Sequence, residues 1–146
     1  MVDKEAVTIA IGADHAGYPL KQALLETVLK GYDVIDLGTD STAPVDYPDI
    51  ARRVATVVAA GKADKGILIC GTGIGMSIAA GKVRGIRAAR CTEPFSAELS
   101  RRHNDANILC LGARITGVEL ASRTVEVWLN TPFEGGRHAR RVGKIE

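Results

Sequence analysis

Short apolar runs rich in β-branched residues alternate along the chain with longer stretches in which apolar residues recur at helical spacing. The runs predict five strands, over Val7–Ile11, Val34–Leu37, Ile67–Ile69, Ile86–Arg90 and Ile108–Leu111. They do not alternate apolar with polar residues as a strand with one solvated face does. We therefore expect a sheet that is covered on both faces.

A stretch of helical periodicity follows each predicted strand. Prolines stand near the start of three of these predicted helices, at Pro19, Pro48 and Pro94. Thr116 and Glu119 have the spacing of a capping box, which predicts the start of the last helix. Five strand–helix units predict an α/β fold, a three-layer Rossmann-like sandwich with a five-stranded parallel sheet, in one domain over residues 1–146.

The last part of the chain departs from this pattern. Residues 131–136, with one proline and two glycines, predict a turn or loop. Four cationic or titratable side chains then fall within residues 137–141. We expect residues 131–146 to form an extended C-terminal tail, which needs an anion or a neighbouring chain to fix its position.

Composition narrows the class of protein. An apolar fraction of 46%, a charged fraction of 25% and a net charge of +2 are typical of a soluble globular protein and give no reason to expect nucleic acid or an anionic membrane as partner. No segment approaches the roughly 18 apolar residues of a membrane span, and the first residues do not resemble a secretory signal. Cys70, Cys91 and Cys110 form no CxxC pair, so we expect reduced thiols, no structural zinc and a cytoplasmic location.

Polar residues gather where predicted strands end, which is where α/β sheets bind ligands. Asp14 and His15 follow the first strand, and Cys70–Gly75 follows the third. His103 and Asn104 end the fourth predicted helix, just before the fifth strand. We expect all three segments to converge on one rim of the sheet.

The segment Cys70–Gly75 has glycine at alternate positions, Gly71, Gly73 and Gly75. Such a turn lets backbone N–H groups at a helix start approach an anion, either a phosphate or a negative charge that develops during reaction. A tight turn that only connects a strand to a helix remains an alternative.

Cys70 stands directly before this turn. A helix start favours the thiolate, which could act as a nucleophile or as a proton acceptor. The alternative is a buried cysteine that fills space, which we expect of Cys91 and Cys110. Likewise, His103 and Asn104 could simply end a helix, and Asp14 could form a turn with its own backbone.

Five strings of residues together resemble the ribose-5-phosphate isomerase B family, which includes galactose-6-phosphate and allose-6-phosphate isomerases. They occur in the family's order and with its spacing, and they span nearly the whole chain. The strings are Gly12-x-Asp14-His15-x-Gly17, Asp46-Tyr47-Pro48, Gly66–Gly75, Ser100-Arg101-x-His103-Asn104-Asp105 and Gly135-Gly136-Arg137-His138-x-x-Arg141.

The resemblance implies a role for each matching residue. Cys70 would be the base that moves a proton between C1 and C2 of the open-chain sugar, and His103 the acid/base that opens the furanose ring. The enediolate oxygens would be held by Thr72 and by the N–H groups of Gly71, Gly73, Ile74 and Gly75. Sugar contacts would come from Asp14, His15 and Asn104. The phosphate would be gripped by Arg114, Arg137 and Arg141, with His138.

The family resemblance also implies a homodimer or a dimer of dimers, with an active site shared between subunits and completed by the C-terminal tail. It implies no metal and no cofactor. Some members use a glutamate just after the glycine turn as base; Met76 stands there, which implies the cysteine version. Ribose 5-phosphate and ribulose 5-phosphate, of the pentose phosphate pathway, are the expected substrate pair, with six-carbon sugar phosphates as the alternative.

Two other classes of protein could also use a glycine turn or a thiol at this place. A nucleotide-binding module would need an acidic ribose anchor about 20 residues past the glycines, and Glu93 lies near that distance. No Lys-Ser/Thr pair follows the turn, as it would in a P-loop. A thiol redox enzyme would need a second cysteine close to Cys70, and the sequence offers none.

Overall fold

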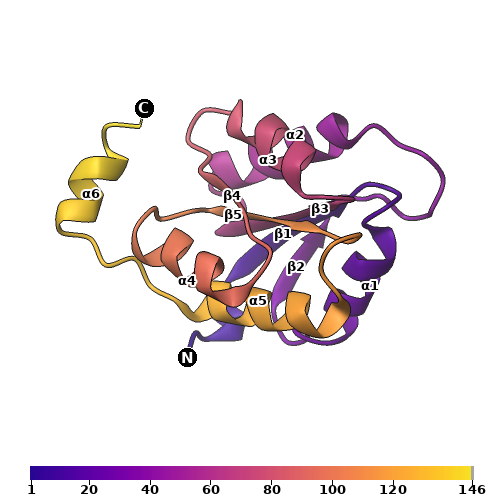
Figure 1. Cartoon of the computed structure of the whole chain (residues 1–146), viewed down its shortest axis with the longest axis horizontal. Helices are drawn as coiled ribbons and strands as arrows, with labels where there is room; N and C mark the ends of the chain where they lie inside the picture. Colours follow the sequence, from indigo (N-terminus) through magenta and orange to yellow (C-terminus); the bar gives the residue numbers. More distant parts are fainter. Residues whose placement is uncertain (146) are drawn as a thin grey trace.

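The computed structural model describes residues 1–145, which contain a five-stranded parallel sheet (Figure 1). Its strands are β1 (Thr8–Ala13), β2 (Asp33–Asp36), β3 (Lys65–Cys70), β4 (Ala88–Arg90) and β5 (Ile108–Gly112). Their order across the sheet is β2-β1-β3-β5-β4. All five predicted strands are confirmed, within one or two residues at each end.

Helices cover both faces of this sheet. The helices are α1 (Tyr18–Glu26), α2 (Tyr47–Ala59), α3 (Ile74–Gly81), α4 (Pro94–Arg102), α5 (Val118–Asn130) and α6 (Arg137–Val142), with a short 3-10 turn η1 (Lys4–Ala6) before β1. One core cluster joins the sheet to α1, α4 and α5, and a second joins it to α2 and α3, which lie above the sheet in Figure 1. The three-layer sandwich is therefore confirmed.

The central strands are buried on both faces, as their unbroken apolar character predicted. In β3, Ile67 and Ile69 belong to the cluster under α1, α4 and α5, while Leu68 and Cys70 belong to the cluster under α2 and α3. Successive side chains of a strand point to opposite faces, so the last residue of β3 is directed to the α2–α3 side. This register places the thiol of Cys70 beside the helix that follows it.

Two details of the prediction need correction. Thr116 is not the N-cap of α5: that position belongs to Gly117, and no side chain caps the helix. The Thr116 N–H donates to the carbonyl of Gly112 at 2.9 Å, so this residue still belongs to the turn that leaves β5. The tail is not extended throughout, because residues 137–142 form α6, after Gly135 and Gly136 turn the chain with positive φ.

The irregular residues 131–136 lead α6 away from the sheet, as Figure 1 shows. Within the part of the chain described, no helix is both long enough and apolar enough to cross a membrane.

Candidate active site

The ends of β1 and β3 bring Asp14 beside Cys70. Ala13 pairs with Ile69 in the sheet, and the N–H of Asp14 donates to the carbonyl of Ile69 at 3.1 Å. The Asp14 carboxylate is buried and accepts the N–H of Gly17 at 2.9 Å. Gly17 itself touches β3 so closely that a Cβ there would collide with the carbonyl of Ile69. The glycine at position 17 of this string therefore allows the chain after β1 to lie directly against the end of β3.

His15 is fixed by the loop between β2 and α2. Its Nδ1 accepts the N–H of Val45 at 3.2 Å, and the ring is half-buried. An Nδ1 that accepts a hydrogen bond leaves the proton of the neutral ring on Nε2, which is then free to donate to a ligand. His15 is therefore arranged as a hydrogen-bond donor at the same edge of the sheet as Asp14.

The glycine turn wraps around the sulfur of Cys70. The thiol is 5% exposed, and its Sγ accepts the N–H of Gly73 at 3.1 Å. Gly73 has φ +81° and is the N-cap of α3, a conformation that favours glycine. Thr72 Oγ1 accepts the N–H of Ile74 at 3.2 Å, which leaves its own hydrogen free to donate. A backbone donor aimed at sulfur is the kind of group that stabilises negative charge there.

Arg114 belongs to this group as well. Its N–H donates to the carbonyl of Gly71 at 3.0 Å, in the turn after β5. Its Cδ and Nη1 lie 3.3 Å from the point that a Cβ of Gly71 would occupy. The guanidinium is therefore packed over the start of the glycine turn.

Two further residues shape the turn and were not predicted. Arg90, at the end of β4, donates from Nε to the carbonyl of Thr72 at 2.9 Å. The ring of Tyr47 packs against Gly75, where any Cβ would overlap it. Arg90 could have been found from the sequence, because it is the last residue of a predicted strand. Tyr47 lies in one of the strings that resemble the family, but that string implied no role for it.

The other two cysteines are core residues, as expected. Cys91 is 3% exposed, and burial raises the pKa of its thiol to about 11. Cys110 is fully buried in β5, and burial raises its pKa further. Both therefore carry neutral thiols at physiological pH, and neither is suited to proton transfer.

A second group of predicted residues surrounds the end of α4. The rings of His103 and His138 stack with centroids 4.2 Å apart and an angle of 10° between their planes. A cavity of about 380 Å³ adjoins them, lined by His103, Asn104, His138, Arg141, Val142 and Ile145. Arg137 begins α6 directly before His138.

The expectation that all these residues share one rim is wrong. Cys70 pairs with Gly112 at the carboxyl end of β5, whereas His103 and Asn104 precede the amino end of that strand. Five residues at about 3.3 Å each separate these edges by about 16 Å. A helix returns the chain to the amino edge of the sheet, so residues that end a helix lie opposite residues that end a strand. In Figure 1, α6 lies at the left, while α1 lies at the right.

Large exposed apolar side chains follow the carboxyl ends of three neighbouring strands, one of which leads into the glycine turn. These side chains are 47–68% exposed and follow β3, β5 and β4: Ile74, Ile78, Phe95, Ile115 and Val118. We call this set the apolar patch. Exposed apolar groups that gather in this way commonly mark a protein interface.

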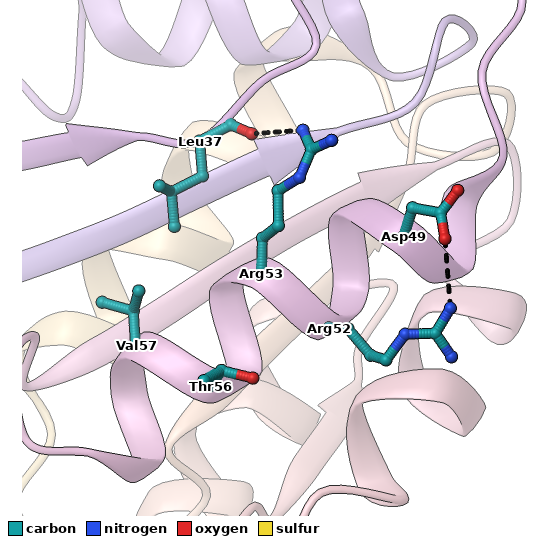
Figure 2. Close-up of a pocket in the computed structure, with 6 residues that line it drawn as sticks. All are labelled: Leu37, Asp49, Arg52, Arg53, Thr56 and Val57. Atoms are coloured by element: carbon teal, nitrogen blue, oxygen red, sulfur yellow. Dashed lines mark hydrogen bonds and ion pairs between the residues drawn. The ribbon is translucent and has the colours of Figure 1, made fainter.

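A larger hollow of about 550 Å³ lies elsewhere, between Leu37 and the outer side of α2 (Figure 2). Its polar groups pair with one another: Arg53 donates to the Leu37 carbonyl at 3.4 Å, and Arg52 pairs with Asp49 at 3.0 Å. None of the predicted site residues lines it, so size alone does not indicate the active site.

Fold and site together define an α/β protein that carries a thiol and a glycine turn at the carboxyl edge of its sheet. The chain belongs to the ribose/galactose isomerase family, whose model matches residues 9–145.

Individual relatives agree with this family over nearly their whole length. Ribose-5-phosphate isomerase B of Escherichia coli is 54% identical over 94% of this chain and 93% of its own. The D-erythrulose-4-phosphate isomerase of Pectobacterium atrosepticum is 46% identical over 95% of this chain and 93% of its own. The structure of ribose-5-phosphate isomerase B from Clostridium thermocellum superposes with a TM-score of 0.93, with 56% identity and 94% of each chain covered.

Proposed function

We propose that the protein is a sugar-phosphate aldose–ketose isomerase that interconverts ribose 5-phosphate and ribulose 5-phosphate through an enediolate. The relatives named for that reaction support the substrate. The observation that carries the chemistry is the 3.1 Å contact from the Gly73 N–H to the Cys70 sulfur, in a turn that also holds Thr72.

Cys70 is the base. Its thiolate removes the proton from C2 of the open-chain aldose, the electron pair of that C–H bond forms the C1–C2 double bond, and the carbonyl pair moves onto O1 to give the enediolate. A proton then passes from the O2 hydroxyl to O1. The same thiol returns its proton to C1 as O2 becomes the carbonyl of the ketose, so no external oxidant or reductant is consumed. A positioned base of this kind contributes a factor of roughly 10²–10⁴ in rate.

The enediolate oxygens need donors while they carry charge. The free hydrogen of Thr72 Oγ1 fills this role, together with those N–H groups of the turn from Gly71 to Gly75 that do not already donate within it. Because the Gly73 and Ile74 N–H groups already donate within the turn, they act mainly by holding the thiol and the Thr72 hydroxyl in place. Asp14 and His15 bind sugar hydroxyls at the same edge.

The other half of the site comes from a second subunit. His103 and Asn104 lie too far from Cys70 to serve the same substrate within one chain, so a partner contributes them for ring opening and hydroxyl binding. The apolar patch beside the glycine turn supplies the surface on which this homodimer, or dimer of dimers, assembles. The C-terminal tail then packs against the neighbouring subunit rather than against its own sheet.

The phosphate is gripped by Arg137, His138 and Arg141 of the partner's tail, across from Arg114 beside the glycine turn. Arg114 therefore approaches from the subunit that holds the thiol, and the two tail arginines from the other. We also expect the protein to work in the cytoplasm, where reducing conditions suit three unpaired cysteines.

Substrate length is the point at which relatives differ. Because a 46% identical relative is named for a four-carbon substrate, a four-carbon sugar phosphate is the second candidate. We expect turnover of ribose 5-phosphate to exceed that of four-carbon and six-carbon sugar phosphates when all are assayed side by side. A higher kcat/KM for a four- or six-carbon substrate would move the assignment to that sugar.

The base is tested by Cys70→Ser. We expect kcat to fall by about 10²–10⁴, because a hydroxyl in place of the thiol is a far weaker proton acceptor at neutral pH. The matched control is Cys91→Ala, which removes a buried thiol remote from substrate and should leave kcat within about twofold while lowering stability by about 1 kcal/mol. Isomerase activity retained in Cys70→Ser would remove Cys70 from the mechanism.

A further inference from the structure

Three potential metal ligands meet where the tail returns to the end of α4. They are His103, Glu134 and His138, whose nearest ligand atoms all lie within 4.8 Å of one another. Glu134 Oε1 is 3.4 Å from Nε2 of His138 and 3.8 Å from Nε2 of His103. Both imidazoles therefore direct the same type of nitrogen toward one carboxylate oxygen.

The backbone holds this cluster together. The N–H of Glu134 donates to the carbonyl of Arg102 at 3.1 Å, which ties the irregular residues 131–136 to the last turn of α4. His138 is 9% exposed and lies four residues after Glu134, while His103 directly follows α4. The three ligands thus come from a hydrogen-bonded junction between two segments rather than from freely moving surface side chains.

The geometry suits a small transition metal ion. Two imidazole nitrogens and one carboxylate oxygen form a common set of three protein ligands for Zn²⁺, with a fourth position open. Metal–ligand bonds of about 2.0–2.2 Å require ligand atoms about 3.3 Å apart in a tetrahedral arrangement. The His138–Glu134 separation already matches. His103 Nε2 has to come about 0.5 Å closer to Glu134, and its ring has to tilt out of the stack so that both imidazole nitrogens point at one ion.

Several charged side chains surround the three ligands. Arg102 lies 3.8 Å from Glu134 and has to move away from this carboxylate when a metal ion binds. Glu98, 3.4 Å from Arg102, can keep the guanidinium paired after that movement. Arg137 and Arg141 favour an anion as the fourth ligand.

We infer that His103, Glu134 and His138 form a binding site for Zn²⁺, and that the bound ion inhibits the isomerase. The inhibition rests on the proposed function, because it assumes that His103 opens the sugar ring; the binding does not. A metal on Nε2 removes the nitrogen with which His103 would exchange a proton and constrains the tail that grips the phosphate.

Binding is tested by titrating ZnCl₂ into metal-free Cys70→Ser protein, in which the most exposed candidate for thiolate binding is absent. The chain has three histidines, so ring ¹⁵N resonances report on each. We expect those of His103 and His138 to shift together and saturate at one ion per chain, while His15 stays unchanged as an internal control. Equal shifts of all three rings, or none at millimolar Zn²⁺, would overturn the site.

The carboxylate is tested by Glu134→Gln in the same background. We expect the apparent affinity for Zn²⁺ to fall by about tenfold or more, because a charged ligand is replaced by a neutral one. The matched control is Glu126→Gln, which removes the same charge from an exposed glutamate of α5 paired with Arg123. Equal affinity in the Glu134 and Glu126 variants would contradict a role for Glu134.

Inhibition is measured separately in protein that retains Cys70, with each variant compared with its own metal-free rate. Zn²⁺ should inhibit, EDTA should restore the rate, and Glu134→Gln should need at least about tenfold more Zn²⁺ for the same inhibition. Equal inhibition of Glu134→Gln would assign the effect to Cys70 instead. Absence of any turnover in metal-free protein would refute the proposed function and leave the binding result standing.

Discussion

Two side chains hold the glycine turn in the shape that the proposed reaction needs. The sulfur of Cys70 accepts the N–H of Gly73, and the guanidinium of Arg90 donates to the carbonyl of Thr72. The same peptide segment is thus fixed at a donor and at an acceptor. Catalysis by preorganised groups depends on such restraint, because a donor that must first reorient contributes less in the transition state.

Arg90 therefore acts as a positioning residue for Thr72. We expect Arg90→Ala to lower kcat by about five- to tenfold with little change in KM, which corresponds to the loss of a hydrogen bond worth about 1 kcal/mol. Steady-state kinetics on ribose 5-phosphate measure both constants. The matched control is Arg84→Ala, at an exposed arginine between α3 and β4. An unchanged kcat in Arg90→Ala, or an equal loss in Arg84→Ala, would contradict the positioning role.

At the scale of elements, the contact of Gly17 with β3 sets how closely α1 begins beside the site. A Cβ at Gly17 would collide with the backbone carbonyl of Ile69, which cannot move without disturbing the sheet. We expect Gly17→Ala to lower the free energy of unfolding by about 2–3 kcal/mol, measured by urea denaturation. Gly81, at the end of α3, is the matched control, because a Cβ there meets nothing within 4 Å. Gly81→Ala should stabilise by up to about 1 kcal/mol; equal effects of the two variants would contradict this account.

Lys65, the first residue of β3, destabilises the folded state to an extent that depends on pH. Burial lowers the pKa of Lys65 to about 8 from 10.5, with Arg101 adding repulsion, and its ammonium lies 5.5 Å from the centre of the Trp128 ring. Below pH 8 the Lys65 ammonium is charged in both the folded and the unfolded state, so the folded state is destabilised by the full free energy of burying that charge. Between pH 8 and 10.5 the unfolded state binds more protons, so stability rises with pH there.

Lys65→Met should remove this dependence. At pH 7 we expect the variant to be more stable than the parent by about 1–2 kcal/mol, a figure discounted for the partial exposure of the lysine. The difference should shrink as pH rises from 8 to 10.5, measured by urea unfolding at both ends of that range. Lys62→Met makes the same change at an exposed neighbour and serves as control. A difference that stays constant with pH would contradict the assignment to Lys65.

The local pattern of apolar and polar residues predicts most of the fold but only part of the site. The central strands β3 and β5 could be predicted because Ile67–Ile69 and Ile108–Leu111 are apolar without interruption, and burial on both faces demands this. The start of α5 could not be predicted in the same way. The Thr116 N–H donates to the carbonyl of Gly112 in a turn, and the spacing of Thr116 and Glu119 in the sequence gives no sign of that turn. Arg90 and Tyr47 reach the glycine turn through space, from 15 or more residues away in the chain, which periodicity does not record.

At the scale of the whole molecule, two groups of predicted site residues lie at opposite edges of one sheet: Cys70 and the glycine turn at one edge, and His103 with the C-terminal tail at the other. Neither edge alone offers both the base and the ring-opening acid/base that the proposed mechanism requires. If the tail of each chain packs against a partner subunit, this explains both the exposed apolar patch at the thiol edge and the position of α6 away from its own sheet at the other edge. Closed two-fold symmetry then produces two identical composite sites per dimer.

Mixing two inactive variants tests this arrangement. If the proposed homodimer is correct, we expect Cys70→Ser and His103→Ala each to inactivate both sites of their own homodimer. When the two are unfolded together and refolded, about half of the dimers contain one chain of each kind. In such a mixed dimer both substitutions fall in one site, and the other site is intact. We expect activity to return to about a quarter of that of the parent protein refolded in the same way.

The control for subunit exchange is a mixture of Cys70→Ser with Thr72→Ala. Both residues lie in the same glycine turn, so every site of a mixed dimer carries one of the two substitutions and none is intact. Activity should therefore stay at the level of the separate variants. Recovery in this control, or no recovery with His103→Ala despite mixed dimers shown by native mass spectrometry, would mean that Cys70 and His103 do not act across a subunit boundary.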